Sequence, residues 1–235
     1  MSDEILRLDA LSCGYGQATV IRDLSLSIQR GEALALLGKN GMGKSTLLKG
    51  IMGFLPRQGG AIFYRGEPLA SGLPHRLAEQ GVAYAQQEKA VFQDLSVEDN
   101  LRIAVADRRQ FSRGLERIAD YFPFIPQRLR QKAGTLSGGE QKMLILGRAL
   151  MMEPTLLLVD EISEGLQPSV IERIAKVLHT ERKTSSVAML IVEQNVDFAL
   201  KTADRYAVLE RGELGALRGT QDADAHIRIL DELGV

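Results

Sequence analysis

The sequence predicts an α/β fold with a mostly parallel core sheet. Short apolar runs with strand character alternate with helix-competent segments near the start of the chain and again from residue 155 onward. Repeated βα units of this kind place helices on the faces of a parallel sheet. Between these two regions, residues 96–152 show helical spacing without a strand pattern, so we expect a helical insertion there.

Local patterns predict the individual elements. Leu24, Leu26 and Ile28 alternate with serines, which indicates a half-exposed strand, whereas residues 33–37 are apolar throughout, as in a buried parallel strand. Ser96 followed by Asp99 resembles a helix capping box with Asp in the place of Glu. In chain order we expect strands at 5–11, 20–28, 33–37, 61–64, 82–85, 155–159, 187–192, 206–209 and 214–217, helices at 46–52, 74–80, 96–105, 141–151, 168–181, 196–202 and 222–233, and a turn at 58–60.

Residues 38–46 read Gly-Lys-Asn-Gly-Met-Gly-Lys-Ser-Thr and directly follow the strand at 33–37. A strand, a G-x-x-x-x-G-K-S loop and a helix form the context of a phosphate-binding loop. The glycines let backbone N–H groups point at an anion, and the helix start adds its own free N–H groups and its dipole. Lys44 can reach the β- and γ-phosphates of a nucleotide, and the Ser45 hydroxyl can hold Mg²⁺.

The apolar strand at 155–159 ends in two carboxylates, Asp160 and Glu161. Ligands of open α/β sheets sit at the carboxyl ends of the strands. Asp160 would therefore help to hold Mg²⁺, directly or through water, and Glu161 would polarise the attacking water as a general base. Such a strand end is a weak signal alone, and it becomes strong in combination with the phosphate-binding loop upstream.

The overall composition excludes several classes of protein. The 235 residues are 45% hydrophobic and 25% charged, an ordinary globular composition, and the net charge of -1 offers no basic field for nucleic acid. A single cysteine, Cys13, excludes a disulfide framework and a cysteine-built zinc site. The start of the chain, Met1–Glu4, is acidic, and the apolar runs are far shorter than the ~20 residues of a membrane helix. We expect no signal peptide and a cytoplasmic chain that meets a membrane only through a partner.

A second glycine pair precedes a predicted helix. Residues 136–141 read Leu-Ser-Gly-Gly-Glu-Gln, which would form a second anion site, although one ATP does not need two such sites from one chain. With the phosphate-binding loop before it and the Asp-Glu strand after it, this motif resembles the signature of the ATP-binding-cassette (ABC) ATPases. The resemblance covers essentially the whole chain. In that family two cassettes pair head to tail, and the signature of each closes over the ATP held by the other.

The resemblance implies an ABC-type P-loop NTPase fold and the cofactors ATP and Mg²⁺. It implies a single ABC ATPase domain over 1–235, in which 1–92 and 153–235 form the nucleotide-binding core with an N-terminal antiparallel β subdomain, and 93–152 form a helical signature subdomain. The expected catalytic residues are Glu161, Lys44, Gln87 and Gln194. The expected metal-binding residues are Ser45, Gln87 and Asp160. The expected cofactor-binding residues are Tyr15, Gly38, Asn40, Gly41, Gly43, Lys44, Ser45, Thr46, Ser137, Gly138 and Gly139.

Some of these positions rest on the resemblance alone. Tyr15 matches the aromatic residue that stacks on adenine, although a lone Tyr is more often a core or turn residue. Gln87 matches the glutamine that senses Mg²⁺ and the attacking water, and the neighbouring Gln86 leaves this register open. Gln194 stands where the family usually has a histidine at the γ-phosphate, and glutamine can donate a hydrogen bond there but cannot carry charge. Ile162 replaces a usual proline, from which we expect a local backbone effect only.

Several runs resemble one branch of the family, the ATP-binding subunits of bacterial importers for branched-chain amino acids, with the urea importers close by. The run at 164–169, Glu-Gly-Leu-Gln-Pro-Ser, and the glutamine at Gln87 are slightly more similar to the urea-type members, and the rest fits either. We expect a motor subunit that pairs with a second ABC ATPase chain and with integral membrane permeases on the cytoplasmic face of the inner membrane, and indirectly with a solute-binding protein. The other runs with this resemblance are 91–101, 132–135 and 192–195.

Other readings compete with an importer motor. A soluble ABC ATPase acting on nucleic acid or ribosomes is disfavoured by the balanced charge, the single cassette and the absence of sustained heptads. A regulatory module without turnover is disfavoured by Glu161, and another solute or an exporter stays open. Basic residues gather in the middle third and more often form a solvated helix face than a docking surface: Arg108, Arg109, Arg113, Arg117, Arg128, Arg130 and Lys132.

Overall fold

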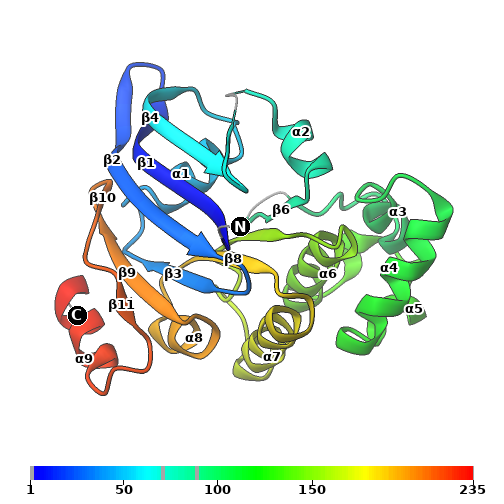
Figure 1. Ribbon diagram of the computed structural model, residues 1–235. Helices are drawn as coiled ribbons and strands as arrows, with labels where there is room; N and C mark the ends of the chain where they lie inside the picture. Colours follow the sequence, from blue (N-terminus) through cyan, green and yellow to red (C-terminus); the bar gives the residue numbers. More distant parts are fainter. Residues whose placement is uncertain (1–2, 70–71, 88–89, 235) are drawn as a thin grey trace.

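The structure, a computed structural model, describes residues 3–69, 72–87 and 90–234 and contains two sheets (Figure 1). The N-terminal sheet has four antiparallel strands in the order β2-β1-β4-β5. Its long hairpin pairs Leu8 with Leu26 and Leu6 with Ile28, so the alternating apolar residues share one face. The strands are β1 (Glu4–Tyr15), β2 (Ala18–Gln29), β4 (Arg57–Tyr64) and β5 (Glu67–Pro68).

The second sheet has seven strands in the order β10-β9-β3-β8-β7-β6, with β11 also paired to β9. Its centre is parallel: β3 lies between β8 and β9, and β7 lies between β8 and β6. The apolar run at 33–37, predicted as a buried strand, is indeed buried at every position, and β7 is buried throughout but begins after Thr155 of the predicted strand at 155–159. The strands are β3 (Ala33–Leu37), β6 (Val82–Ala85), β7 (Leu156–Asp160), β8 (Ala188–Glu193), β9 (Arg205–Glu210), β10 (Glu213–Leu214) and β11 (Arg218–Gly219).

The core sheet separates two hydrophobic cores. Leu34 and Leu36 of β3 pack towards α1 and the N-terminal sheet, whereas Ala33, Ala35 and Leu37 face the helices on the other side. α1 is thus enclosed between the two sheets, and α6, α7 and α8 cover the opposite face (Figure 1). The helices outside the 93–152 region are α1 (Lys44–Ile51), α2 (Pro74–Glu79), α7 (Pro168–Ser185), α8 (Val196–Thr202) and α9 (Ala225–Leu233).

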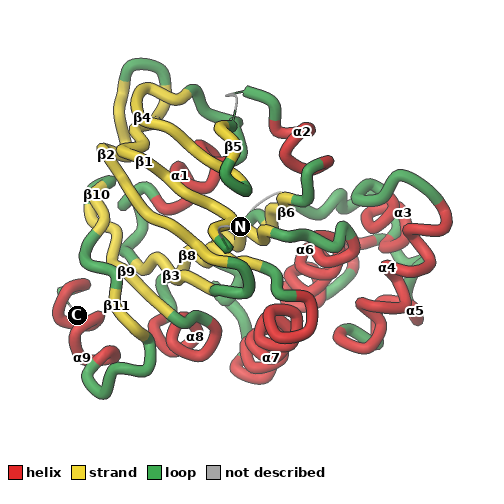
Figure 2. The backbone as a smooth tube through the Cα atoms, in the orientation of Figure 1, coloured by secondary structure: helices red, strands yellow, loops and turns green. Residues whose placement is uncertain are grey.

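Residues 93–152 hold helices and no named strand, as Figure 2 shows at the side of the molecule away from the N-terminal sheet. The Ser96–Asp99 capping box is present at the start of α3. The boundary between core and helical subdomain stays a prediction. No helix in the described ranges is long and apolar enough to span a membrane. The elements of this region are α3 (Val97–Arg102), α4 (Arg108–Tyr121), α5 (Phe124–Gln127), the 3₁₀ turn Ala133–Thr135 and α6 (Gly138–Met151).

The α/β fold class is confirmed, and several predicted boundaries are wrong. The turn expected at 58–60 lies inside β4, because the left-handed Gly60 (φ +75°) lets β4 pass β1 where the two lose register. A Cβ on Gly60 would lie 2.2 Å from the Ala10 carbonyl oxygen. α1 begins at Lys44 and α6 at Gly138, two and three residues before the predicted starts, because in both cases the glycine loop itself winds into the first turn. Of the strand expected at 214–217 only Leu214 lies in a strand, β10; residues 215–217 are irregular and lead to β11, and the two short strands pair with different ends of β9.

Candidate functional site

The phosphate-binding loop leaves the end of β3 and winds into α1. Gly41 and Gly43 have φ angles of +81° and +105°, in the left-handed region that favours glycine. Gly38 is required for space, because a Cβ there would lie 2.6 Å from the Leu209 carbonyl oxygen. The Lys44 side chain at the start of α1 is only 3% exposed, and its Nζ donates a 2.6 Å hydrogen bond to the Gly38 carbonyl oxygen. The loop therefore folds around its own lysine.

Glu161 forms a buried ion pair with Lys44. The Lys44 Nζ lies 2.9 Å from Glu161 Oε1, and the Glu161 side chain is only 5% exposed. Glu161 has a φ of +43°, a conformation that costs on the order of 1–3 kcal/mol for a non-glycine residue and is typical of functional sites. Its N–H donates to the Val192 carbonyl oxygen at 2.9 Å, and its own carbonyl accepts from Lys142 Nζ at 3.0 Å. These bonds hold the backbone that aims the carboxylate at the phosphate-binding loop.

Two glutamine amides complete the surroundings of this carboxylate. Gln87 Nε2 donates to Glu161 Oε2 at 2.8 Å, and Gln194 Nε2 donates to the same oxygen at 3.1 Å. Gln194 also donates to Asn40 Oδ1 at 2.7 Å, so it bridges the phosphate-binding loop and Glu161. Of the two neighbouring glutamines, Gln87 lines the same cavity as Glu161 and Gln86 lines a different cleft, so the register with Gln87 stays the prediction.

Ser45 and Asp160 form the site at which a metal could bind. Ser45 Oγ donates to Asp160 Oδ1 at 2.9 Å, and the Tyr84 hydroxyl donates to Asp160 Oδ2 at 2.7 Å. Burial raises the pKa of the Asp160 carboxyl above its usual range, and these two hydrogen bonds oppose that rise. A hydroxyl and a carboxylate are hard oxygen donors and fit Mg²⁺. Among the described residues no group of three or more His, Cys, Asp or Glu could hold a metal, so phosphate oxygens and water would have to supply the other ligands.

Most of the predicted nucleotide-binding residues line one cavity of about 590 Å³. Tyr15, at the end of β1, is 50% exposed at this cavity, so its ring is accessible for stacking on a base. Gly38 and Asp160 are not in its lining and border it through Lys44 and Ser45. The lining residues are Tyr15, Val20, Asn40, Gly41, Gly43, Lys44, Ser45, Thr46, Gln87, Glu161 and Glu164.

The signature residues lie apart from this cavity. Ser137 is the N-cap of α6, where its Oγ accepts a 3.3 Å hydrogen bond from the Glu140 N–H. Ser137 and Gly138 are exposed, and Gly139 lies against Val170 of α7. The cavity that holds Lys44 and Glu161 contains none of these three residues. In the described chain, the signature therefore lies at the surface and outside the lining of the nucleotide cavity.

Sequence reasoning missed two residues that contact the site. Tyr84 was assigned only to a strand, although its position two residues before Gln86 on β6 places it beside the end of β7. Lys142 was read as part of the signature helix, yet it reaches the Glu161 backbone across the core. Burial lowers the pKa of Lys142, while four surrounding carboxylates, Glu164 foremost, oppose that shift. Neither contact has a local signal in the sequence, because each joins residues on different elements.

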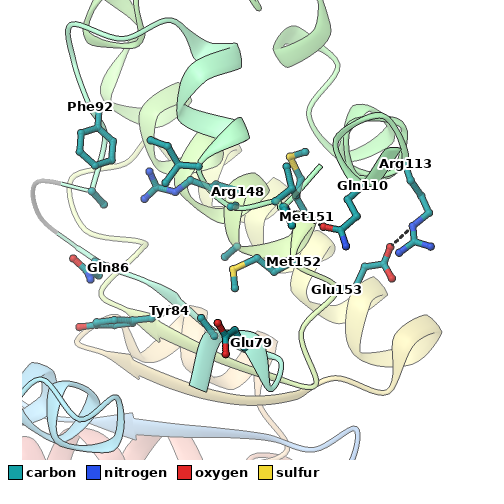
Figure 3. A pocket seen from close by; sticks show the side chains of 17 residues that line it. Glu79, Tyr84, Gln86, Phe92, Gln110, Arg113, Arg148, Met151, Met152 and Glu153 are labelled. Atoms are coloured by element: carbon teal, nitrogen blue, oxygen red, sulfur yellow. Dashed lines mark hydrogen bonds and ion pairs between the residues drawn. The ribbon is translucent and has the colours of Figure 1, made fainter. Parts of the chain in front are cut away.

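A cleft of about 800 Å³ lies between the core and the helical region (Figure 3). Its walls come from α2, β6, the segment between α3 and α4, and the C-terminal part of α6. Arg148 and Met152 project into it in Figure 3, and Arg113 forms an ion pair of 2.8 Å with Glu153 at one end. In the described residues Arg148 has no hydrogen-bond or ion-pair partner. Of the predicted basic cluster, Arg113 lines this cleft and Arg108 does not.

Comparison with known proteins decides the family. Residues 21–164 match the family described as ABC transporter. This chain is an ABC ATPase. It is 40% identical to the high-affinity branched-chain amino acid transport ATP-binding protein BraG of Pseudomonas aeruginosa, across 89% of this chain and 91% of that protein. It is 36% identical to the probable branched-chain amino acid transport ATP-binding protein LivF of Archaeoglobus fulgidus, across 92% of both.

Further comparisons agree on the fold and broaden the range of transport systems. The ABC ATPase is 32% identical to the lipopolysaccharide export system ATP-binding protein LptB of Escherichia coli, across 87% of this chain and 86% of LptB. It superposes on a nucleotide-free ATP-binding cassette of an ABC transporter with a TM-score of 0.86, 24% identity and coverage of 98% and 97%. It also resembles a dimeric cassette in a post-hydrolysis state bound to ADP and Pi, with a TM-score of 0.82, 18% identity and coverage of 92% and 99%. The chain is therefore an ATP-binding subunit of an ABC transporter and an ATPase.

Proposed function

We propose that this ABC ATPase is the motor subunit of an importer for branched-chain or other amino acids, or for urea. The observation that supports this proposal is the 40% identity to BraG over nearly the full length of both chains. The subunit would work on the cytoplasmic face of the inner membrane, on permeases that receive solute from a solute-binding protein. The 32% identity to LptB makes an export system the second candidate.

Solute uptake tests the direction and the substrate class. Cells that carry the wild-type subunit or Glu161→Gln take up radiolabelled leucine, isoleucine, valine and urea in parallel assays. The proposal expects the wild-type subunit to support uptake of at least one of these solutes and Glu161→Gln to abolish it. Equal uptake with both subunits for all four solutes would contradict the proposed substrate class.

For the chemical step, we propose that Lys44 and the N–H groups of the phosphate-binding loop hold the β- and γ-phosphates while Tyr15 stacks on adenine. Ser45 and Asp160 would hold Mg²⁺, which supplies charge neutralisation at the phosphate oxygens. The contacts of Glu161 with Lys44 and Gln87 place its carboxylate beside the phosphate-binding loop, where it can accept a proton from the attacking water. Gln194 would position that water or the γ-phosphate by hydrogen bonding alone.

We further propose that two chains pair head to tail, so that Ser137 and Gly139 of each cap the γ-phosphate held by the other. The exposed signature supports this arrangement, since the first turn of α6 lies at the surface, where a phosphate held by a second chain could reach its N–H groups. Closure can perform work only because ATP favours the closed pair more than ADP does. Size-exclusion chromatography of Glu161→Gln should show a dimer with ATP and a monomer with ADP, and a monomer in both conditions would refute the pairing.

The 800 Å³ cleft is our proposed contact with the permease. Phe92 and Ile103 line it and are 51% and 56% exposed, so it offers apolar surface, and Arg148 adds a guanidinium without a partner in the described residues. Burial lowers the pKa of Arg148, and a carboxylate would offset the cost of holding this charge in the cleft. The occupant that fits is a permease segment with apolar residues and one acidic side chain.

Charge reversal tests this contact. Arg148→Glu should prevent co-purification of the ATPase with its permeases from membranes while ATP binding by the isolated subunit persists. Arg173→Glu, on an exposed position of α7 outside the cleft, is the matched control and should co-purify like the wild type. If Arg148→Glu also co-purifies normally, the permease docks elsewhere.

A further inference from the structure

Tyr84 connects the metal site to the cleft. In the register of the sheet Tyr84 pairs with Leu158 on β7, and Asp160 follows two residues later on the same strand. Successive side chains of a strand alternate between faces, so Tyr84 and Asp160 project from the same face as diagonal neighbours. The Tyr84 hydroxyl donates a 2.7 Å hydrogen bond to Asp160 Oδ2. It thus contacts one of the two oxygens that could face a metal.

The Asp160 carboxylate is held from both sides. Ser45 Oγ, on the side of the phosphate-binding loop, donates a 2.9 Å hydrogen bond to Asp160 Oδ1. The Tyr84 hydroxyl, on the side of β6, donates to Asp160 Oδ2. Asp160 is only 3% exposed, so water cannot replace a lost donor freely. Without the Tyr84 hydroxyl, Oδ2 would be a buried acceptor without a partner, and the carboxylate would be free to rotate away from Ser45.

The ring of Tyr84 is itself fixed on the cleft side. It lies 6.4 Å from the Phe54 ring, measured between centroids, and it lines the 800 Å³ cleft. Figure 3 shows it at the floor of the cleft beside Gln86, with its hydroxyl pointing away from Met152. Tyr84 is absent from the lining of the nucleotide cavity. Its hydroxyl reaches the nucleotide site through its hydrogen bond to Asp160.

We propose that Tyr84 is a positioning residue that orients the Asp160 carboxylate for Mg²⁺ and links this carboxylate to the cleft. The proposal rests on the proposed Ser45–Asp160 metal site. Hydrogen bonds to the ligands of a metal orient those ligands, and their loss typically weakens metal affinity by about 10–100-fold. Removing only the Tyr84 hydroxyl should therefore lower the affinity for the metal. The contacts of the nucleotide with the phosphate-binding loop should stay unchanged.

Tyr84→Phe in a Glu161→Gln background tests this proposal without hydrolysis. The Mn²⁺ affinity in the presence of ATP is measured by electron paramagnetic resonance, and ATP binding without metal is measured in EDTA. We expect Mn²⁺ to bind at least about tenfold more weakly in Tyr84→Phe than in its Glu161→Gln parent. ATP binding in EDTA should be unchanged, and it also reports the folded fraction if the variant is less stable.

Tyr64→Phe in the same background is the matched control. The Tyr64 hydroxyl also donates a hydrogen bond within the protein, to the Gln80 carbonyl oxygen at 3.0 Å, but it lies outside the nucleotide cavity. This control should retain the parent Mn²⁺ affinity. An unchanged Mn²⁺ affinity in Tyr84→Phe, or an equal loss of ATP binding in EDTA, would overturn the positioning role. Failure of the Glu161→Gln parent itself to bind Mn²⁺ in the presence of ATP would instead refute the proposed metal site.

Discussion

Two glycine-containing helix starts in this ABC ATPase look alike in sequence and differ in structure. The phosphate-binding loop before α1 has two left-handed glycines and encloses a lysine that is 3% exposed. The signature before α6 has an ordinary N-cap, Ser137, whose hydroxyl is satisfied by its own helix, and it lies on the surface. At the first site, Glu161 and Asp160 of the same chain contact Lys44 and Ser45. The second lies at the surface and outside the lining of the first site's cavity, which is the arrangement expected of a surface that acts on a second chain.

The strongest test of this contrast mixes two inactive variants. Lys44→Ala should lower ATPase activity by more than about 100-fold, because the phosphates lose their buried cation and Glu161 loses its ion-pair partner. Ser137→Ala should lower it by about 10–100-fold through the loss of one donor at the γ-phosphate. If the signature acts in trans, mixed dimers contain one intact site, so mixing the two should restore measurable activity in a phosphate-release assay.

Ser96→Ala is the control for the structural part of the Ser137 substitution. Both serines form capping boxes, and loss of such a cap costs about 1 kcal/mol of stability by itself. Ser96→Ala should therefore lower the unfolding free energy about as much as Ser137→Ala while ATPase activity persists. Activity that does not recover in the Lys44→Ala and Ser137→Ala mixture would show that the signature serves its own chain.

Replacing a glycine by alanine should lower the stability much more in the phosphate-binding loop than in the signature. Gly43→Ala places a Cβ 2.9 Å from Ile21 Cδ1 at a φ of +105°, so we expect it to lower the free energy of unfolding by roughly 1–3 kcal/mol and to abolish ATP binding. A Cβ on Gly138 meets nothing within 4 Å, so Gly138→Ala should change stability by less than about 1 kcal/mol. Urea denaturation measures both. Equal destabilisation by the two substitutions would contradict the claimed difference in backbone geometry.

The smallest expected effect concerns the reactivity of two thiols, the native Cys13 beneath α1 and a cysteine introduced at the signature. Cys13 is fully buried under α1, and burial raises its pKa to about 11. Only the thiolate reacts, so its fraction at pH 8 should be about a thousandth and should grow about tenfold per pH unit up to that pKa. Ser137→Cys introduces an exposed thiol that should react with a maleimide at pH 8 while Cys13 stays unlabelled by mass spectrometry. ATP should protect only the introduced thiol in a Glu161→Gln background, and rapid labelling of wild-type Cys13 would disprove its burial.

Local sequence signals predicted the elements of the fold well where one pattern decides them. The all-apolar run at 33–37 is a buried strand, the apolar residues 156–159 lie in a second one, and the Ser96–Asp99 capping box forms as expected. The errors lie where tertiary contacts override the local pattern. Gly59 and Gly60 read as a turn, yet they continue β4, because pairing with β1 stabilises the irregular backbone there.

The residues of the candidate site likewise fall into those that local sequence predicts and those that only tertiary contacts bring to the site. Lys44 and Ser45 were predicted from residues within a few positions of each other, since the loop and its helix fold locally. Tyr84 and Lys142 were missed, because their contacts with Asp160 and Glu161 depend on the order of strands β6 and β7 and on the packing of α6. No spacing within one element predicts a contact between side chains on two elements.

The sequence by itself determined the chemistry of this protein: a phosphate-binding loop, a carboxylate pair at a strand end and a second helix start rich in glycine. These depend on backbone freedom and short spacing, which a sequence states directly. Only the tertiary structure decided that Glu161 pairs with Lys44, that Tyr84 donates a hydrogen bond to Asp160, and that Ser137 lies outside the lining of the nucleotide cavity. Those relations depend on which strands become neighbours and which side of the sheet each helix covers, and they are settled by packing of the whole chain.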